Sequence, residues 1–325
     1  MLKWGLIGLG NMANHFAKSI SEVDNSELIA ISSSSKKKLD KFGQNFSIKI
    51  NNRFNNYLDI LNSNVDAVYI STLNNNHAAL IEFLIKNNKK VLCEKPFVIN
   101  YQEAENLNRL IKSKDNNFFE AIAYRSHPQT EEIISLINNG TIGDIYKIES
   151  TFGFQIKKIN PKSRLFNKDV GGGAILDIGC YPVSFAFLFC GKNDEIKINK
   201  VSGNICKTGV DNHAELFGSI NDKIELDLKV SFQKNFKNSC KIYGSKGNLN
   251  ITSPWLPEKK TYLEVNLDNS YYKKFIMCNK NVYAQQIGVI SDKFLSNETN
   301  YKNLVNISQS TKISKILTNW RNMLD

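Results

Sequence analysis

Three side chains in this 325-residue chain are suited to moving a proton during a redox reaction: Lys95, Asp177 and Tyr181. Asp177 and Tyr181 are four residues apart, so on a single helix both would project from one face. A phenol has an ordinary pKa of about 10 and needs help at neutral pH, which the Lys95 ammonium can give by favouring the phenolate. Asp177 would then orient the lysine or a substrate hydroxyl. The residues alone equally allow a structural interpretation, in which Asp177 caps a helix and Tyr181 packs at its edge.

A second group of residues has the pattern of a dinucleotide-binding turn. A strand-like segment runs directly into a G-x-G-x-x-A sequence that opens a helix. Gly8 permits the tight turn, Gly10 lets the backbone approach a pyrophosphate, and the small Ala13 allows the helix to pack closely on the strand. The backbone N–H groups at the start of the helix, around Asn11 and Met12, would bind the phosphates. The alternative is an ordinary glycine-rich turn.

The segment after the second strand-like run, residues 28–32, indicates which dinucleotide is bound. The Asp or Glu that usually holds the ribose 2′-hydroxyl of NAD is missing there. The chain continues instead with hydroxyls and cations: Ser33, Ser34, Ser35, Lys36, Lys37 and Lys38. Ser33, Ser34, Ser35 and Lys38 suit a 2′-phosphate, so we expect NADP as the cofactor, with NAD as the alternative. The usual arginine is absent, and a serine turn that caps a helix with exposed lysines would have the same sequence.

The elements that must position these residues follow from the apolar pattern. Residues 2–7, 28–32, 65–71, 90–93 and 117–122 are strand-like and alternate with helix-like segments. This alternation is typical of βαβ units and a parallel sheet. We therefore expect an N-terminal Rossmann domain over residues 1–122, which binds the dinucleotide.

The pattern changes after about residue 123. Helices are expected over residues 128–139, 177–189 and 303–324, with a strand at 145–150. Residues 196–276 read as antiparallel strands, in which Leu226, Leu228 and Val230 alternate with polar residues. The fold class is therefore α/β, with the Rossmann domain followed over residues 123–325 by an α/β domain that has a large, mostly antiparallel open sheet. We expect this second domain to bind the substrate and to form oligomers.

Several motifs make the chain resemble one known family. Glu94, Lys95 and Pro96 follow the strand-like run 90–93, at the edge of the sheet where ligands bind in open α/β folds. This Glu-Lys-Pro sequence resembles the signature of the glucose-fructose oxidoreductase / inositol dehydrogenase (Gfo/Idh/MocA) family. Thr72, Asn74 and His77 stand where that family has a T-P-N-x-x-H segment, with Leu73 in place of the proline.

The resemblance extends over nearly the whole chain. Tyr124 and Arg125 look like part of the family's stretch between domains, and the glycines at 171–173 with Asp177 and Tyr181 resemble its second signature. Many members have His at the position of Tyr181. Tyr at that position, and Arg164 with its neighbours, resemble the branch that contains dihydrodiol dehydrogenase and NADP-linked xylose dehydrogenase.

The resemblance implies a role for each matched residue. It places Lys95 near the nicotinamide and the substrate, and makes Tyr181 the acid/base, with Lys95 and Asp177 as partners. Cofactor contacts are implied for Thr72, Asn74, His77 and Glu94, and substrate contacts for Tyr124, Arg125 and Arg164. A homodimer or homotetramer, formed through the outer face of the large sheet, is implied as well.

Composition argues against several other classes of protein. The net charge is +11, but the lysines are scattered in twos and threes, so no nucleic-acid partner is expected. No stretch approaches the ~20 apolar residues that cross a bilayer, and the N-terminus leaves no room for a signal peptide, so we expect a cytoplasmic protein with no membrane contact. The six cysteines are widely spaced and no histidine has metal-ligand spacing, so neither a disulfide framework nor a metal site is expected.

The sequence thus predicts an NADP-dependent oxidoreductase that transfers a hydride between nicotinamide and a hydroxyl or keto carbon of a sugar, polyol or diol. Two alternatives remain open. One is a ketoreductase of a nucleotide-linked sugar, and the other is a catalytically silent dinucleotide-binding sensor.

Overall fold

The computed structural model describes residues 1–112, 117–191, 193–296 and 303–324. The chain forms two compact units, and each is built from several segments. The first unit comprises Met1–Val98, Gln102–Ser126 and Lys280–Thr311; the second comprises Ile99–Tyr101, His127–Asn279 and the residues from Lys312 onward. The expected domain boundary at residues 122 and 123 stays a prediction, but the segment Lys280–Thr311 packs with the N-terminal unit.

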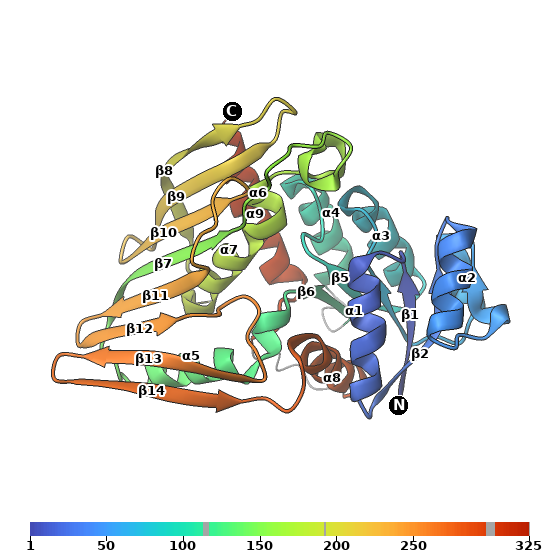
Figure 1. Ribbon diagram of the computed structural model, residues 1–325, viewed down its shortest axis with the longest axis horizontal. Helices are drawn as coiled ribbons and strands as arrows, with labels where there is room; N and C mark the ends of the chain where they lie inside the picture. The colour runs from blue at the N-terminus through green and yellow to red at the C-terminus, as the bar shows by residue number, and fades with distance from the viewer. Residues whose placement is uncertain (113–116, 192, 297–302, 325) are drawn as a thin grey trace. The chain divides into compact units, whose positions relative to one another are not determined.

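The first unit contains a parallel sheet of six strands in the order β3-β2-β1-β4-β5-β6 (Figure 1). The strands are β1 (Leu2–Ile7), β2 (Ser26–Ser32), β3 (Arg53–Phe54), β4 (Ala67–Ile70), β5 (Lys90–Glu94) and β6 (Phe118–Ala121). The helices are α1 (Asn11–Ser19), α2 (Lys36–Asn45), α3 (His77–Lys86), α4 (Tyr101–Ile111) and α8 (Val282–Leu295), with short 3-10 turns η1 (Ile20–Glu22), η2 (Ile50–Asn52), η3 (Tyr57–Asn62), η4 (Asn74–Asn76) and η6 (Ala123–Ser126). The order confirms the predicted Rossmann sheet.

The strands of this sheet are buried on both faces, as expected for a parallel sheet covered by helices. Trp4 of β1 is fully buried, and its ring packs on Phe16 of α1 and Phe294 of α8. The Trp4 indole N–H donates to the Ser291 hydroxyl at 3.0 Å. Helix α8, whose Ser291 is 287 residues from Trp4 in the sequence, therefore completes the core of the first unit.

The second unit contains an eight-stranded sheet in the order β14-β13-β12-β11-β7-β10-β9-β8. Its strands are β7 (Ile145–Gly153), β8 (Ile196–Ile205), β9 (Asp211–Ile220), β10 (Ile224–Ser231), β11 (Ser239–Gly244), β12 (Gly247–Ile251), β13 (Lys260–Leu267) and β14 (Ser270–Met277). The helices are α5 (Pro128–Asn138), α6 (Ala174–Ile178), α7 (Cys180–Ala186) and α9 (Ile307–Asn322), with turns η7 (Arg164–Phe166), η8 (Lys168–Val170) and η9 (Phe187–Phe189). Only the β7–β10 pair is parallel, which confirms a mostly antiparallel sheet.

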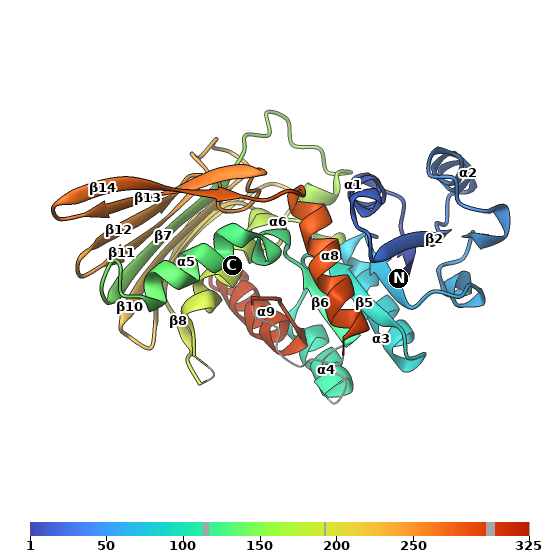
Figure 2. The same cartoon turned by 90° about the horizontal axis from the view of Figure 1, so that it is seen from below.

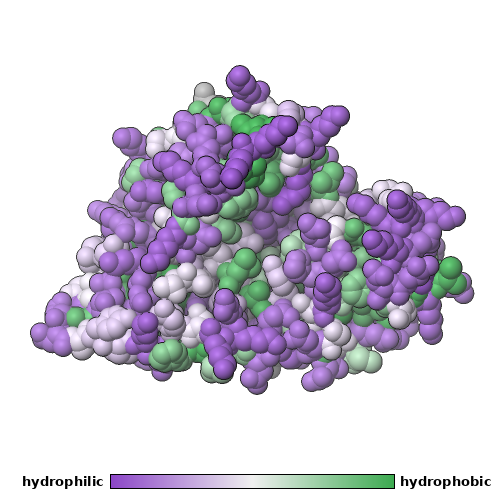
Figure 3. Space-filling view, viewed as in Figure 1, coloured by the Kyte–Doolittle hydropathy of each residue, from purple (hydrophilic) through white to green (hydrophobic). Residues whose placement is uncertain are grey.

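One face of this sheet packs on helices. Leu226, Leu228 and Val230 of β10 are buried, while Asp227 and Lys229 on the other face are partly exposed, which confirms the predicted alternation. Helices α6 and α7 contact β10, and α5 contacts β13 and β14. Figure 2 shows α5 on one side of the sheet, and Figure 3 shows hydrophobic side chains among hydrophilic ones along β14.

The prediction of one helix over residues 177–189 was wrong. The chain forms α6, α7 and η9, and the axis bends by 48° between the segment that ends at Ile178 and the one that begins at Cys180. Asp177 therefore lies in α6 and Tyr181 in α7. A side chain at Gly179 would collide with the Ile175 carbonyl, so the bend depends on glycine there. The argument that Asp177 and Tyr181 share one face of a straight helix does not hold.

No single helix among the described residues is long and apolar enough to cross a membrane. One bent pair, Lys168–Ile178 with Cys180–Phe189, passes the same test by length and composition.

The start of α6 depends on a close approach between Gly173 and Asp211. Gly173 has a φ of +113°, and an added Cβ would collide with the Asp211 carboxylate. The Asp211 Oδ2 atom accepts the Ile175 backbone N–H at 2.7 Å, so a carboxylate from β9 caps α6. Burial raises the pKa of Asp211 to about 6, against the opposing effect of that N–H. The glycine allows this cap to form.

We expect Gly173→Ala to lower the free energy of unfolding by about 3 kcal/mol, because it combines a φ that only glycine adopts readily with the collision at Asp211. Gly140→Ala is the matched control. Gly140 also has a positive φ, +68°, but an added Cβ meets no atom within 4 Å, so we expect a loss of about 1 kcal/mol. Denaturant unfolding of both variants measures the difference, and equal losses would contradict the role given to Asp211.

Candidate active site

The turn between β1 and α1 has the geometry expected of a pyrophosphate cradle. Gly8 has a φ of +89°, and an added Cβ would lie 2.8 Å from both the Ser71 oxygen and the Thr72 nitrogen. At Gly10 an added Cβ meets no heavy atom within 4 Å, and the start of α1 has no side-chain cap. Ala13 is fully buried, whereas the predicted contact residues Asn11 and Met12 are exposed and half-buried. The open space at Gly10 and the uncapped N–H groups fit a dinucleotide phosphate.

The serines after β2 divide into two kinds. The Ser33 hydroxyl is buried and accepts the Ser35 N–H at 3.2 Å, and the Ser35 hydroxyl accepts the Lys38 N–H at 3.4 Å as the N-cap of α2. Both hydroxyls therefore take part in the turn, as the capping interpretation expects. Ser34 and the Lys38 side chain are exposed. They are the better placed of the predicted 2′-phosphate ligands.

The residues after β4 form a buried contact between the start of α3 and the Glu-Lys-Pro segment. Thr72 is partly exposed and Asn74 is buried. His77 is fully buried, and its Nδ1 lies 3.0 Å from the Pro96 carbonyl oxygen. Burial lowers the pKa of His77 to about 4, so the ring is neutral at physiological pH. His77 thus links the start of α3 to the Glu-Lys-Pro segment without bringing a charge.

Glu94 is anchored on the neighbouring strand. Its carboxylate accepts a short hydrogen bond from the Tyr69 hydroxyl, and both residues are buried. Burial, and then the charge of Glu94, raise the pKa of Tyr69 well above its usual value, so the phenol stays a donor. The Tyr69 ring stacks on Phe16 of α1 at 4.3 Å between centroids. This contact connects the end of β5 to the helix that follows the glycine turn.

Lys95 lies next to a second buried carboxylate. Glu120 on β6 is 3% exposed, and its Oε1 accepts the Phe97 N–H at 3.2 Å. Burial raises the pKa of Glu120 to about 7, the charge of Glu94 adds to this, and the charge of Lys95 opposes it. Lys95 itself is partly exposed. Our sequence reasoning gave Glu120 no functional role, although a carboxylate within an apolar strand is a signal that could have been used.

Two of the residues expected to contact substrate are enclosed within the first unit. Tyr124 and Arg125 are 1% and 2% exposed. The Arg125 guanidinium donates to the Asn303 carbonyl at 2.6 Å and to the Gln309 side chain at 2.9 Å. Arg125 therefore fixes the chain that leads into α9.

The second unit brings together Asp177 and Arg164. The Arg164 Nη1 lies 2.9 Å from Asp177 Oδ1, and the aspartate side chain is 7% exposed against 50% for the arginine. The Tyr181 ring meets Phe152 edge-on at 5.1 Å and lies 6.1 Å from Trp255. Phe152 and Trp255, which sequence reasoning missed, form an apolar wall beside the phenol. Their positions come from β7 and from the segment after β12, which no local pattern links to Tyr181.

Among the described residues, no group of three or more His, Cys, Asp or Glu side chains is arranged to hold a metal ion.

Comparison with known proteins gives matches over most of the chain. Residues 2–122 match the family model described as the Gfo/Idh/MocA oxidoreductase family with an NAD-binding Rossmann fold, and residues 130–250 match its C-terminal domain. The trans-1,2-dihydrobenzene-1,2-diol dehydrogenase of Xenopus tropicalis is 30% identical over 78% of this chain and 77% of its own length.

Two solved structures are similar in fold. KijD10, a 3-ketoreductase from Actinomadura kijaniata in complex with NADP and TDP-benzene, has a TM-score of 0.87 at 21% identity and covers 99% of this chain and 98% of its own. An aldose-aldose oxidoreductase from Caulobacter crescentus, complexed with glycerol, has a TM-score of 0.86 at 21% identity and covers 99% and 97%.

The raised pKa of Glu120 predicts a pH dependence of stability. The folded state binds a proton at Glu120 more tightly than the unfolded chain, so this stabilisation is present below pH 4.5 and is lost as the pH rises through about 7. Glu120→Gln cannot titrate, and we expect it to gain stability relative to the native chain by about 2 kcal/mol between pH 5 and 8. Urea unfolding across that range measures the difference. The exposed Glu82→Gln is the control, and parallel curves for Glu120→Gln and the native chain would contradict the assignment.

Proposed function

Because the chain belongs to the Gfo/Idh/MocA oxidoreductase family, whose members are NAD(P)-dependent dehydrogenases that act on CH–OH groups, we propose that it oxidises or reduces a sugar, polyol or diol with NADP. The observation that carries the proposal is the β1–α1 turn, which leaves open space at Gly10 beside uncapped helix N–H groups. A catalytically silent sensor would need this turn but would not need Lys95, Asp177 and Tyr181.

The residues of the first unit would hold the cofactor. The backbone from Gly8 to Ala13 would bind the pyrophosphate, and Ser34 and Lys38 would bind the 2′-phosphate, with support from Ser33 and Ser35. Thr72 and Asn74 would line the site, while Glu94 and His77 would act by holding the surrounding backbone. When bound, NADP supplies the hydride acceptor or donor for the reacting carbon.

We propose that Tyr181 exchanges the proton of the reacting hydroxyl. Its contacts with Phe152 and Trp255 orient the ring and exclude water from one side. The Lys95 ammonium would favour the phenolate and polarise the substrate oxygen. Asp177 would hold Arg164 against a further substrate hydroxyl, since the ion pair leaves half of the arginine side chain exposed.

The substrate class rests on the relatives. The Xenopus tropicalis relative is named for a dihydrobenzene diol, and the similar folds include enzymes named for a keto group and for aldoses. A vicinal diol or a sugar presents the same unit, a carbinol carbon with a neighbouring hydroxyl. A ketoreductase of a nucleotide-linked sugar is the second candidate.

We further propose a homodimer or homotetramer, formed through the outer face of the eight-stranded sheet. On β14 of that face Phe275, Met277 and Tyr271 are 71%, 61% and 56% exposed. Exposed apolar side chains on an open sheet favour burial against a second copy. Sedimentation that shows only monomers at micromolar concentration would contradict this. The cytoplasmic location stays a prediction.

The experiment that tests the function is a screen by NADPH absorbance. NADP reduction is measured with aldoses, inositols and diols, and NADPH oxidation with keto sugars, including a nucleotide-linked one. Turnover in either direction, lost in Lys95→Met, supports the proposal. Absence of turnover with all of them, in a protein that binds NADP, would favour the silent sensor.

The cofactor preference gives a separate prediction. We expect calorimetry to show tighter binding of NADP than of NAD, and Ser34→Asp to reverse this order, because a carboxylate repels the 2′-phosphate and accepts from the 2′-hydroxyl. Ser21→Asp, which adds the same charge at an exposed site in η1, is the control and should leave the order unchanged. Equal affinity of the native chain for NAD and NADP would count against Ser34 as a phosphate ligand.

The proposed proton transfer by Tyr181 gives a further prediction. Tyr181→Phe removes one oxygen and keeps the packing on Phe152 and Trp255, so we expect a stable protein that binds NADP. General acid-base catalysis is worth about 10² to 10⁴ in rate, so kcat should fall within that range and the basic limb of its pH profile should change. Tyr262→Phe, on β13, is the control and should match the native chain. Full activity with an unaltered profile would leave Tyr181 as a packing residue.

A further inference from the structure

Glu120 is a buried acid to which none of the roles proposed above is given. It lies on β6 next to Phe118 and Phe119, and its side chain belongs to the core of the first unit, with 3% of the residue exposed. Acidic side chains are almost never fully buried unless they are paired. The groups around Glu120 therefore indicate what it does.

Glu120 and Glu94 approach Lys95 from opposite faces of the parallel sheet. Leu92 of β5 and Phe119 of β6 both pack in the core that includes α1 and α8. Because side chains alternate along a strand, Glu94 lies on the same face as Leu92, and Glu120 lies on the other face. Lys95 is the next residue after Glu94, so it leaves the edge of the sheet between the two acids.

Two hydrogen bonds hold Glu120. Its backbone N–H donates to the Val305 carbonyl at 2.9 Å, and its Oε1 accepts the Phe97 N–H at 3.2 Å. Phe97 follows Lys95 by two residues, so the acid fixes the backbone of the Glu-Lys-Pro segment. The second carboxyl oxygen, Oε2, has no hydrogen-bond partner among the described residues. A negative charge there would be incompletely paired, which favours the neutral acid.

The titratable groups that face Glu120 are Cys93, Glu94 and Lys95. Ser310, in the first turn of α9, adds a hydroxyl. Burial, and then the charge of Glu120, raise the pKa of Cys93 well above its usual value, so the thiol stays neutral. Burial raises the pKa of Glu120 itself to about 7. The negative charge beside Lys95 therefore increases when Glu120 ionises near neutral pH.

The interaction between Glu120 and Lys95 is mutual. The positive charge of Lys95 makes Glu120 release its proton more readily, so an ionised Glu120 holds the Lys95 ammonium more firmly by the same free energy. An ionised Glu120 also weakens the positive field that Lys95 offers to an oxyanion developing on a substrate. A neutral Glu120 leaves that field undiminished.

We propose that Glu120 is a positioning residue for the reaction. It holds the backbone next to Lys95 through Phe97, and by gaining or losing its own proton it sets how much of the Lys95 charge acts on the substrate oxygen. The proposal rests on the proposed function, in which Lys95 polarises that oxygen. It adds a group that controls Lys95 from inside the sheet without touching the substrate.

The test is competitive labelling of the lysines of the whole protein by acetic anhydride between pH 6 and 10, with mass spectrometry of the peptide that contains Lys95. Only the neutral amine reacts, so the rate reports how firmly the ammonium is held. Glu120→Gln keeps an acceptor for the Phe97 N–H and removes the charge. At pH 9 we expect Lys95 to react about tenfold faster in this variant than in the native chain. At pH 6, where Glu120 is largely neutral, the two rates should agree.

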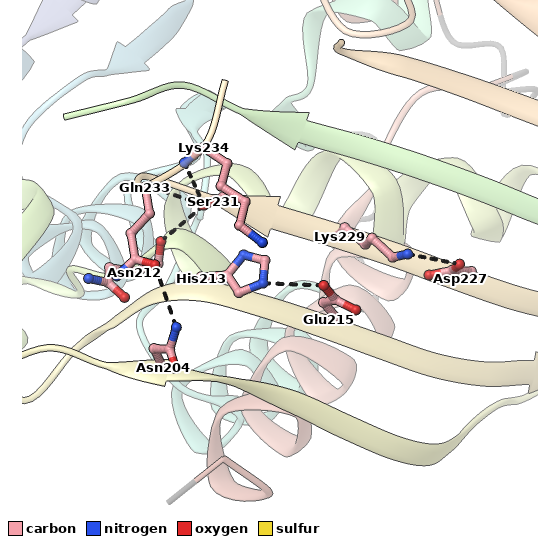
Figure 4. Close-up of polar contacts among 9 residues, drawn as sticks. All are labelled: Asn204, Asn212, His213, Glu215, Asp227, Lys229, Ser231, Gln233 and Lys234. Atoms are coloured by element: carbon pink, nitrogen blue, oxygen red, sulfur yellow. Dashed lines mark hydrogen bonds and ion pairs between the residues drawn. The ribbon is translucent and has the colours of Figure 1, made fainter. Parts of the chain in front are cut away.

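Asp227→Asn is the matched control. Asp227 lies on β10 in the second unit, burial raises its pKa as well, and its Oδ2 pairs with the Lys229 ammonium at 3.2 Å (Figure 4). The variant removes a comparable pair of acid and lysine elsewhere in the chain. Labelling of Lys95 in Asp227→Asn should therefore match that of the native chain.

A pH profile of turnover gives the second reading. With a keto substrate from the NADPH screen, kcat of the native chain should fall as the pH rises through about 7, because the ionised Glu120 offsets the Lys95 charge. Glu120→Gln should lack this fall. A residue that only supported the fold would change the height of the profile and leave its shape unaltered.

Three results would overturn the proposal. They are equal labelling of Lys95 in Glu120→Gln and the native chain at pH 9, an equally large increase in Asp227→Asn, and a fall of kcat near pH 7 that persists in Glu120→Gln. Labelling needs no substrate, so the two proposals can fail separately. Turnover with unchanged labelling leaves the proposed function standing and removes the role of Glu120, whereas altered labelling without any turnover confirms the coupling and contradicts the proposed function.

Discussion

The hydrogen bond from the Tyr69 hydroxyl to the buried Glu94 carboxylate is the interaction on which most of the first-unit site depends. Glu94 is the last residue of β5, so this bond fixes the point at which the chain turns into Lys95. The same Tyr69 ring stacks on Phe16, three residues beyond Ala13. The glycine turn and the lysine, which are more than 80 residues apart in the sequence, are thus held by one phenol. Burial makes the bond obligatory, because neither a carboxylate nor a hydroxyl can be left without a partner inside the sheet.

The second unit uses a buried carboxylate in a comparable way. Asp211 on β9 caps α6, which carries Asp177, and Asp177 in turn holds Arg164. The cap can form only where Gly173 has no side chain. Both units therefore position a chemical group through an acid that is itself removed from solvent. Each acid contributes rigidity: Glu94 immediately precedes Lys95, and Asp211 supports the helix whose Asp177 pairs with Arg164.

Local pattern was enough to predict the parallel strands and the glycine turn. Strand β1 was predicted at its observed bounds. A strand of a parallel sheet is buried on both faces, so it is marked in the sequence by a continuous run of apolar residues. The two-residue strand β3 was missed, since Arg53 and Phe54 carry no periodicity. The break between α6 and α7 was missed because Gly179 keeps helical dihedral angles, with φ −69° and ψ −23°. Only its contact with Ile175 shows why a glycine is needed there.

The roles of the candidate site residues stay a prediction, and several of their contacts differ from those expected. Ser35 and Lys38 were grouped as phosphate ligands, yet the Ser35 hydroxyl caps α2 by accepting the Lys38 backbone N–H. Glu120 was given no role and Asp211 was not named, because the feature that makes each of them important is burial of a polar group. Burial of that kind is set by tertiary packing and leaves no mark on the neighbouring sequence. The packing of α8 in the first unit was hidden for the same reason.

The central claim is that the chain's own groups serve a direct hydride transfer at a carbinol carbon. The most direct measurement uses a substrate from the NADP-linked screen that is deuterated at that carbon, with NMR of the NADPH that is formed and of the water. The account predicts that all of the deuterium is found at C4 of the nicotinamide and none in the water. Deuterium released to the solvent, with ordinary hydrogen at C4, would contradict it.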